Sequence, residues 1–388
     1  MGLYIWGVVK IARGEPMSEP IRVLHILQRM EAAGVQTLLM NLYRKIDREK
    51  VQFDFLVHYT TPQFFDEEVE ALGGKIYRFS VREDYNFPKY YRDLNKFFKE
   101  HKEYKIVHGH MHTLGGIYLH VAKKNGIPVR IAHSHTNATQ RDAKRFVKII
   151  MNHLYAVDAN VLFACSSAAG KYMFGSKQFE VINNAIITDS FVFNHKTREN
   201  KRRELNVENR FVVGNVGRFE IQKNQRFTVE VFEQLNKVCP DSVLLLIGTG
   251  SMQDDIKALA AEKGLQDSVM FLGNRRDVAE LYQAMDVFLM PSLFEGLGIV
   301  GVEAQAAGTP VVCTDTLPDE INVSPLVYRL SLEKPADEWV ETVLTAAKNP
   351  QRHQNMKQYI IDANYDMDAL AKGIQTFYEN QSSLLQDD

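Results

Sequence analysis

Two glutamates, Glu295 and Glu303, have a spacing that suits the binding of a sugar or a ribose. They lie in PSLFEGLGIVGVEAQAAGTP (residues 291–310), where a short apolar run leads into a glycine-bearing loop and then a helical pattern. Eight residues span slightly more than two helical turns, so both carboxylates can face one cleft and accept from vicinal hydroxyls. The loop predicts a phosphate site, because free amides and the positive end of the helix dipole meet there. A capping Glu295 with a solvated Glu303 is the alternative from spacing alone.

Two cations, Arg218 and Lys223, could hold a diphosphate. They follow a strand-like run in VGNVGRFEIQKNQ (residues 213–225). Arginine offers a planar fork to phosphate oxygens, whereas lysine offers a mobile point charge. At the carboxyl end of the first strand of a parallel sheet, such a pair points toward the ligand. The alternative is a pair of surface cations on a turn.

A set of histidines follows two successive strand-like runs in the first half of the chain. Its members are His108, His110 and His112 after one run, and His133 and His135 after the next. Histidines at the carboxyl ends of neighbouring parallel strands lie where substrates bind. Three or more histidines could also bind a metal, but no carboxylate stands at ligand spacing, so we expect no metal site.

A further loop, Gly248 to Ser251, follows a buried strand-like run. Its sequence, GTGS, falls short of the G-x-G-x-x-G pattern of dinucleotide sites, and the first strand of neither half leads into that pattern. The sequence therefore argues against NAD(P) or FAD, and we expect no cofactor.

Elements that could position these residues alternate along the whole chain, as short apolar runs and longer amphipathic segments. In the first half the predicted strands are Arg22–Leu27, Phe53–Val57, Lys75–Phe79, Ile106–Val107, Val129–Ala132 and Val161–Ala164. The predicted helices between them are Val35–Lys45, Phe64–Ala71, Lys89–Lys99, Leu114–Lys124 and Lys144–Tyr155. This alternation indicates parallel βαβ units in a doubly wound α/β sheet.

The pattern restarts after a highly charged stretch, NHKTRENKRRELNVE (residues 194–208), which we interpret as a connection that includes a short helix. The strands predicted beyond it are Phe211–Val216, Val243–Ile247, Val269–Phe271, Val287–Met290 and Pro310–Cys313, and Lys334–Lys348 and Met367–Asn380 are predicted closing helices. Two Rossmann-like domains that face one central cleft are therefore expected, with ligands at the carboxyl ends of both sheets.

The expected domain bounds follow from this division. Residues 17–190 are expected to form the amino-terminal domain, and residues 191–364 the carboxyl-terminal domain, whose first part, 191–209, is the linker. Residues 365–388 are expected to hold a last helix. Residues 1–16 lack the basic region and cleavage pattern of a signal peptide, so they are interpreted as an upstream extension before Met17. An interfacial anchor is the alternative.

Composition excludes several classes of protein. The net charge of −2 over 388 residues is not that of an electrostatic nucleic-acid binder. Three widely spaced cysteines exclude a disulfide scaffold and a structural zinc site, and no run approaches the roughly 18 apolar residues of a membrane span. Lys and Arg outnumber Asp and Glu by 24 to 18 over residues 17–190, whereas over 191–388 they are outnumbered by 29 to 20. The two halves therefore have different partners, and without export features we expect a cytoplasmic protein.

Taken together, these segments resemble the retaining glycosyltransferases of family 4, which have the GT-B fold. The glutamate pair in FEGLGIVGVEAQAAGTPVV is similar to the E-x7-E element of that family, supported by GRFEIQKNQ and by ACSSAAGKYMFG followed by VINNAI. The segments VLHILQRMEAAGVQTLLMNLYRKI and RIAHSHTN resemble the branch that assembles capsular and extracellular polysaccharides. The likeness runs from about Arg22 to near Tyr378. It implies that residues 17–190 form the acceptor-side domain and that residues 191–364 bind the nucleotide sugar. It also implies that the last helix, in residues 365–388, packs back on the amino-terminal domain.

The resemblance implies a role for each matching residue. Glu303 would hold the nucleotide ribose, Glu295 would lie near the donor sugar, and His133 or His135 would contact that sugar, with ungapped spacing favouring His133. The implied catalytic set is Glu295, His133, Arg218 and Lys223, and the implied donor-binding set is Gly34, Gly217, Arg218, Lys223, Gly250, Arg275, Glu295, Gly296, Leu297, Gly298 and Glu303. Two positions depart from the family pattern: Ala33 replaces a glycine of the first loop, and Thr249 replaces an acidic residue.

The implied reaction transfers a sugar from a nucleotide-diphosphate sugar, expected to be a UDP-sugar, to a glycan or lipid-diphosphate-linked acceptor. A metal is not expected, because the cations and helix amides would stabilise the departing diphosphate. The basic and apolar segment Arg141–Met151 is a candidate for peripheral contact with the inner face of the plasma membrane, or else a core-facing helix with solvated cations. A nucleotide-sugar 2-epimerase and a non-catalytic sugar-nucleotide-binding protein are the alternative functions.

Overall fold

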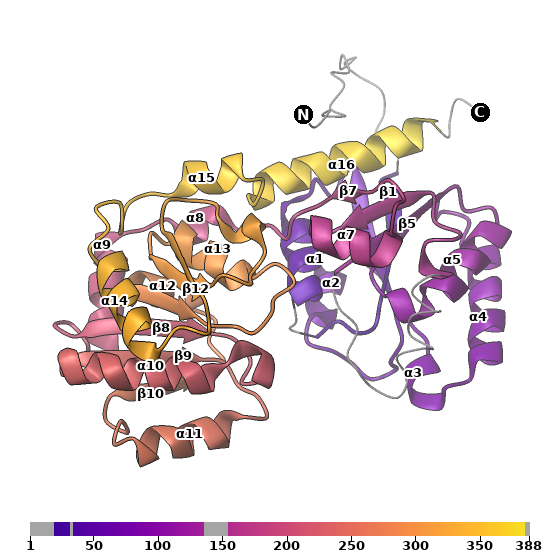
Figure 1. Cartoon of the computed structure of the whole chain (residues 1–388). Coiled ribbons are helices and arrows are strands. Elements are labelled where there is room, and N and C mark those ends of the chain that lie inside the picture. Colours follow the sequence, from indigo (N-terminus) through magenta and orange to yellow (C-terminus); the bar gives the residue numbers. More distant parts are fainter. Residues whose placement is uncertain (1–18, 32–33, 136–153, 385–388) are drawn as a thin grey trace.

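The computed structural model describes residues 19–31, 34–135 and 154–384. In these residues the chain forms two parallel β-sheets, each packed between helices, in two domains that lie side by side (Figure 1). The predicted α/β fold with two Rossmann-like domains is therefore confirmed. Residues 1–16 and the basic segment Arg141–Met151 lie outside the described residues.

The amino-terminal sheet has seven parallel strands in the order β3-β2-β1-β4-β5-β6-β7. The strands are β1 (Ile21–Leu27), β2 (Val51–Val57), β3 (Ile76–Arg78), β4 (Ile106–Gly109), β5 (Val129–Ser134), β6 (Val161–Ala164) and β7 (Glu180–Val181). The helices are α1 (Gly34–Lys45), α2 (Asp66–Ala71), α3 (Val81–Asp84), α4 (Phe87–Glu100), α5 (Gly115–Lys124) and α7 (Ser167–Phe174), with a 3-10 turn, η1 (His112–Leu114). Successive residues of β1 bury opposite faces: Leu24 packs on the side of α4 and α5, and Val23 on the side of α1.

The carboxyl-terminal sheet has six parallel strands in the order β10-β9-β8-β11-β12-β13. The strands are β8 (Phe211–Val216), β9 (Ser242–Ile247), β10 (Val269–Gly273), β11 (Val287–Met290), β12 (Val311–Thr314) and β13 (Val327–Leu330). The helices are α9 (His195–Glu204), α10 (Gln225–Val238), α11 (Gln253–Glu262), α12 (Val278–Ala284), α13 (Ile299–Ala306) and α14 (Ala336–Ala346), with 3-10 turns η2 (Ile221–Lys223) and η3 (Asp319–Ile321).

Both sheets share one topological feature. The strand order reverses between β1 and β4 in the first sheet and between β8 and β11 in the second. At such a switch point the flanking loops diverge to opposite faces, and the gap beyond the carboxyl ends of the strands accepts ligands. The structure therefore defines one candidate ligand position in each domain.

The charged stretch 194–208 forms α9, which packs against α12. Arg198 and Arg202 donate to the buried carboxylate of Asp286 at 2.7 and 3.2 Å, and Arg352 lies 3.7 Å from it. Burial alone would raise the pKa of Asp286, but the three guanidiniums and the hydrogen bond from Val212 N outweigh it and hold the pKa below its usual value. Ion pairs rather than apolar side chains thus attach this helix.

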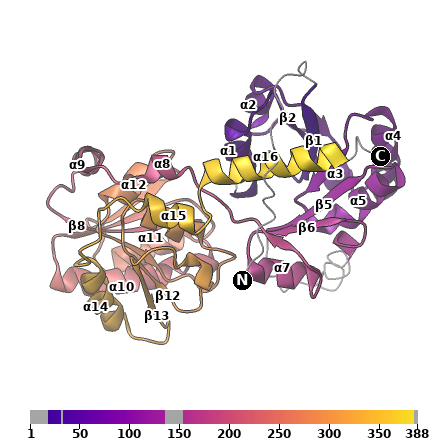
Figure 2. The same ribbon diagram turned by 90° about the horizontal axis from the view of Figure 1, so that it is seen from above.

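Two segments connect the domains, and they are hydrogen-bonded to each other. One contains Ile186, which precedes α8 (Thr188–Phe191), and the other follows α15 (Lys357–Asp362). Ile186 N donates to Tyr365 O at 2.8 Å, and Met367 N donates to Ile186 O at 2.9 Å. The last helix, α16 (Met367–Leu384), then crosses the amino-terminal domain and packs against α1, β1 and β2 (Figures 1 and 2).

A contact between loops shows how the two sheets are oriented. Phe64 follows β2, Arg276 follows β10, and each lies beyond the carboxyl end of its strand. The guanidinium carbon of Arg276 lies 5.8 Å from the centre of the Phe64 ring. The carboxyl edges of the two sheets therefore approach each other here.

Every predicted strand overlaps an observed one, but two edge strands, β7 and β13, and the helices α3, α7, α8 and α15 were not predicted. Most of the predicted helix Lys144–Tyr155 lies outside the described residues. Of the helices within the described residues, none has the length and apolar character needed to cross a bilayer.

Candidate functional site

Lys223 and Glu295 meet at the switch point of the carboxyl-terminal sheet. Lys223 lies in η2 after β8, Glu295 lies in the loop after β11, and Lys223 Nζ is 2.6 Å from Glu295 Oε1. Four further hydrogen bonds join the two loops: Leu293 N to Gln222 O (2.8 Å), Gln222 Nε2 to Phe294 O (2.9 Å) and to Glu295 Oε2 (3.5 Å), and Asn224 Nδ2 to Pro291 O (3.1 Å). The adjacency of β8 and β11 thus brings together two residues that the sequence analysis treated as separate motifs.

Glu303 lies on α13, behind this pair. Tyr282 donates its hydroxyl hydrogen to Glu303 Oε2 at 3.0 Å. Burial raises the pKa of Glu303 to about 7, against the smaller lowering effects of Tyr282 and Lys223. A carboxyl with this pKa changes protonation state near neutral pH.

The glycine loop between the two glutamates leads directly into α13. Gly298 precedes the helix with φ of +77°, a left-handed conformation that side-chain-bearing residues rarely adopt. A Cβ at Gly296 would have no atom within 4 Å, so open space borders the backbone there. The side chain of Leu297 is buried in the core, which leaves only its backbone available to a ligand.

Arg218 extends from the end of β8 with an exposed side chain. Within the described residues its guanidinium has no hydrogen bond and no ion pair. Beside it, the ends of β8 and β9 touch: a Cβ at Gly248 would collide with the carbonyl of Gly217, and one at Gly250 with the backbone of Phe219. Close packing therefore accounts for glycine at 248 and 250, and it places the Gly250 loop next to Arg218.

Arg275 lies two residues beyond β10, at the same edge of the sheet. Its guanidinium is held by Asp277 at 2.5 Å and by Glu204 at 3.1 Å. Lys201, 7% exposed, also lies 2.7 Å from Asp277, so the ion-pair network extends onto α9. In this structure Arg275 connects α9 to the edge of the sheet.

In the amino-terminal domain, Gly34 is the first residue of α1, just beyond the carboxyl end of β1. A Cβ at Gly34 would meet no atom within 4 Å. The helix therefore begins with accessible backbone at the second switch point.

Four of the five predicted histidines gather at this same edge, together with His25, which the sequence analysis did not single out; the fifth, His112, begins η1 and takes no part in the hydrogen bonds of this cluster. The cluster comprises His25 on β1, His108 and His110 at β4, and His133 and His135 at β5. Two chains of hydrogen bonds run through it. The bonds are His25 Nδ1 to His110 Nε2 (3.0 Å), His110 Nδ1 to His135 Nε2 (3.0 Å), His108 Nε2 to His133 Nδ1 (3.1 Å) and His108 Nδ1 to the Tyr378 hydroxyl of α16 (2.7 Å).

Burial governs the charge of this cluster. It lowers the pKa of every one of the five rings, to about 3 for His25 and His135, so all are neutral at physiological pH. Two sets of three could offer nitrogens to a metal, His25 with His108 and His110, and His110 with His133 and His135. Neither set includes a carboxylate to offset the charge of a buried divalent ion, and most of the ring nitrogens are already hydrogen-bonded.

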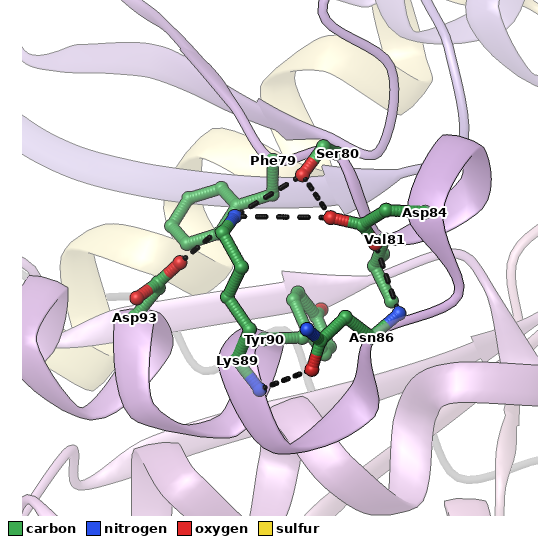
Figure 3. Close-up of a pocket in the computed structure, with 8 residues that line it drawn as sticks. All are labelled: Phe79, Ser80, Val81, Asp84, Asn86, Lys89, Tyr90 and Asp93. Atoms are coloured by element: carbon green, nitrogen blue, oxygen red, sulfur yellow. Dashed lines mark hydrogen bonds and ion pairs between the residues drawn. The ribbon is translucent and has the colours of Figure 1, made fainter.

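A hollow elsewhere in the amino-terminal domain lies between α3 and α4 (Figure 3). Lys89 Nζ occupies it, 3.1 Å from Ser80 Oγ, 3.2 Å from Asp93 Oδ2 and 3.9 Å from Asp84 Oδ2. None of the predicted site residues lines this hollow, and its charges already pair with each other.

Three residues that contact the predicted site were not found from the sequence: His25, Tyr282 and Tyr378. His25 stands in an apolar strand-like run, and both tyrosines are fully buried helical residues with ordinary core spacing. Their roles depend on contacts between distant segments, for which the sequence pattern carries no signal.

Comparison with known families matches both domains. Residues 32–190 match the family described as Glycosyltransferase Family 4, and residues 196–363 match the family described as Glycosyl transferases group 1.

Curated relatives cover most of the chain. It is 33% identical over 357 residues to the putative glycosyltransferase EpsF of Bacillus subtilis, covering 89% of this chain and 93% of that protein. It is 25% identical to the UDP-Gal:alpha-D-GlcNAc-diphosphoundecaprenol alpha-1,3-galactosyltransferase of Escherichia coli, covering 76% and 79% of the two chains. It is also 25% identical to the capsular polysaccharide biosynthesis glycosyltransferase CapH of Staphylococcus aureus, covering 73% and 78%.

Solved structures share the fold. HepE of Anabaena in complex with UDP and glucose superposes with a TM-score of 0.74 at 18% identity, covering 92% of this chain and 99% of that one. Sucrose-phosphate synthase of Thermosynechococcus elongatus gives a TM-score of 0.71 at 18% identity, covering 94% and 99%.

Proposed function

Because this chain belongs to the family 4 glycosyltransferases of GT-B fold, we propose that it transfers a sugar from a UDP-sugar to a glycan acceptor with retention of anomeric configuration. It is a glycosyltransferase by family, and the proposal concerns the donor, the stereochemistry, the acceptor and the residues that act.

The observation that carries the proposal is the placement of Lys223, Glu295 and Glu303 together at the switch point between β8 and β11. A nucleotide-diphosphate sugar offers a ribose, two phosphates and a sugar in a row. Glu303 suits the ribose, Arg218 and Lys223 suit the diphosphate, and Glu295 with the open backbone at Gly296 suits the sugar. Gly34 and His133, from the facing domain, complete the site.

Departure of the nucleoside diphosphate is the step at which negative charge develops. Arg218 and Lys223, with the amides that begin α13, would stabilise that charge without a metal. The acceptor hydroxyl attacks from the face that the leaving group vacates, and its proton passes to the departing phosphate oxygen. The new glycosidic bond forms as the sugar–phosphate bond breaks, so no residue acts as a nucleophile.

The identity of the donor and the pathway is supported by the relatives. The Escherichia coli relative uses UDP-galactose, and HepE was solved with UDP and glucose. The CapH relative acts in capsular polysaccharide biosynthesis. We therefore assign this enzyme to the cytoplasmic assembly of a cell-surface polysaccharide.

The experiment that tests the function is transfer from a panel of nucleotide sugars to glycan and polyprenyl-diphosphate-linked acceptors, with the product anomer read by NMR. Retention with a UDP-sugar supports the proposal. Inversion, epimerisation of the free donor, or donor binding without any transfer or hydrolysis would each refute it.

For the acceptor we propose a lipid-diphosphate-linked glycan, met by peripheral contact with the inner face of the plasma membrane. The acceptor of the Escherichia coli relative carries diphosphoundecaprenol, and the basic segment Arg141–Met151 would add roughly 1 kcal/mol per cation near an anionic leaflet. Flotation with anionic vesicles should carry the intact protein but not the Lys144→Glu, Arg145→Glu, Lys148→Glu triple variant. Equal flotation of both would contradict membrane contact through this segment.

A further inference from the structure

A buried chain of hydrogen bonds connects the last helix of the protein to His133. The Tyr378 hydroxyl on α16 is 2.7 Å from His108 Nδ1, and His108 Nε2 is 3.1 Å from His133 Nδ1. The three side chains are 0%, 3% and 4% exposed. At the other end of this series of hydrogen bonds, His133 Nε2 is buried and has no hydrogen-bond partner among the described residues.

The direction of this chain follows from counting donors and acceptors. A neutral imidazole carries one N–H and one acceptor nitrogen, and burial keeps both rings neutral. His108 is the hydrogen-bond partner of the Tyr378 hydroxyl in the described residues. If Tyr378 accepted from His108, its own O–H would be left buried and unpaired, and His133 Nε2 would be an unpaired acceptor as well. If Tyr378 donates, His133 Nε2–H is the one unpaired group among these three side chains.

When Tyr378 donates, it determines which ring nitrogen carries the proton in His108 and in His133. His108 Nδ1 accepts, so the proton of His108 is on Nε2 and is donated to His133 Nδ1. The proton of His133 is then on Nε2. We propose that Tyr378 and His108 hold His133 in this tautomer so that its buried Nε2–H donates to an oxygen of the donor sugar. The proposal rests on the proposed function, and it makes Tyr378 and His108 positioning residues.

The second series of hydrogen bonds in the histidine cluster shows how the tyrosine fixes the direction of the first. His25, His110 and His135 are joined by two hydrogen bonds, but neither end is bonded to a hydroxyl. Either direction leaves one unpaired donor and one unpaired acceptor, at His25 Nε2 and His135 Nδ1, so the protonation pattern is not fixed. This difference selects His133 over His135 as the defined hydrogen-bond donor to the sugar.

The first measurement uses the unmodified protein. Long-range 1H–15N NMR of histidine-labelled full-length protein at neutral pH distinguishes the two tautomers of each ring, with His133→Gln used for assignment. We expect His133 in the Nε2–H form and His108 in the Nε2–H form. His133 in the Nδ1–H form would overturn the proposal without any need for a variant that folds.

The second measurement uses Tyr378→Phe, which removes only the hydroxyl. We expect the His133 signal to become a mixture of tautomers and kcat/KM for the UDP-sugar to fall on the order of tenfold, because the wrong tautomer cannot donate. UDP lacks the transferred sugar that His133 is proposed to contact, so its Kd should not change. An unchanged tautomer together with unchanged kcat/KM would overturn the proposal.

Tyr43→Phe is the matched control. Tyr43 is also fully buried in this domain, and its hydroxyl bonds to Gln52 and Leu72 O, away from the histidines. It should lose stability without any change of tautomer. If the unmodified enzyme transferred no sugar at all, the proposed function would fail, while the tautomers of His108 and His133 would still decide whether the hydrogen-bond chain runs as described.

Discussion

Lys223 Nζ lies 2.6 Å from Glu295 Oε1, although 72 positions separate the two residues in the chain. In this structure the lysine is therefore neutralised by a carboxylate, whereas the guanidinium of Arg218 is exposed. Under the proposed function, a diphosphate would bind Arg218 directly but would compete with Glu295 for Lys223. The two cations would thus differ in how readily they bind the phosphates.

Replacement of either cation by alanine should lower kcat on the order of 100-fold or more, by analogy with the loss of one oxyanion donor. Arg203→Ala, which removes an exposed arginine from α9, is the control and should leave kcat unchanged. Steady-state rates with a saturating UDP-sugar are the measurement. Full turnover by Arg218→Ala and Lys223→Ala, with folding intact, would contradict the assignment.

UDP binding should tighten as the pH rises from 6 to 8. The pKa of Glu303 is raised to about 7, so the ionised form, which accepts most strongly from two ribose hydroxyls, becomes dominant over this range. The Glu303→Gln variant should bind UDP more weakly and lose this part of the pH dependence. Phosphate ionisation, with a second pKa of about 6, affects both proteins alike. Calorimetric titrations that give the same pH slope for both would rule out a ribose-binding Glu303.

The two glycines of the loop before α13 should respond differently to alanine. Gly296→Ala adds a methyl group to open space and should preserve Tm, yet it should reduce kcat/KM on the order of tenfold because the methyl occupies room proposed for the sugar. Gly298→Ala forces φ of +77° on a residue with a Cβ and should lower stability by about 1 kcal/mol. Thermal unfolding and kinetics on the same samples test the pair. A loss of stability in Gly296→Ala would show that the space is not open.

Asp286→Asn should reduce the free energy of unfolding by about 3–5 kcal/mol, because it leaves Arg198 and Arg202 buried without their counter-charge. Since the pKa of Asp286 is held below its usual value, its contribution is complete above the usual pKa of an aspartate and is lost as the pH falls through the folded-state value. Urea unfolding at pH 7 and below pH 4 should show the difference shrinking. Asp254→Asn, 98% exposed, is the control and should have little effect at either pH.

Transfer should continue in the presence of EDTA, because in the proposed mechanism fixed cations and helix amides stabilise the departing diphosphate. Metal analysis of the protein before and after chelation completes the experiment, since the histidine cluster offers nitrogens. Abolition of activity by EDTA and its rescue by Mg²⁺ or Mn²⁺ would contradict a metal-free reaction.

The main strands could be predicted from the sequence because buried parallel strands are continuous apolar runs. Edge strands such as β13 (VYRL) are short and half-buried, so they lack that signal. The helix α9 is attached to its domain through Lys201 and Arg202, and its composition therefore resembles a linker.

The residues of the candidate site also differ in whether the sequence could predict them. Glu295 and Glu303 could be singled out by their spacing across a glycine loop and the helix that follows it, and Arg218 and Lys223 because they lie between a strand and a helix. The pairing of Lys223 with Glu295 could not, because it depends on the order of strands in the sheet. The place of Tyr378 beside His108 depends on a helix that returns from the other domain, 270 positions away.

The path of α16 also sets an order of events during synthesis. Met367, Ala371, Ile374 and Tyr378 belong to the core that includes Val23 and Phe53, residues that are made well before α16. The amino-terminal sheet must therefore wait, with part of its apolar face uncovered, until α16 has been made. The carboxyl-terminal sheet has its own cores and can fold before that moment. A pulse-proteolysis time course during translation should find the second domain protected before the first.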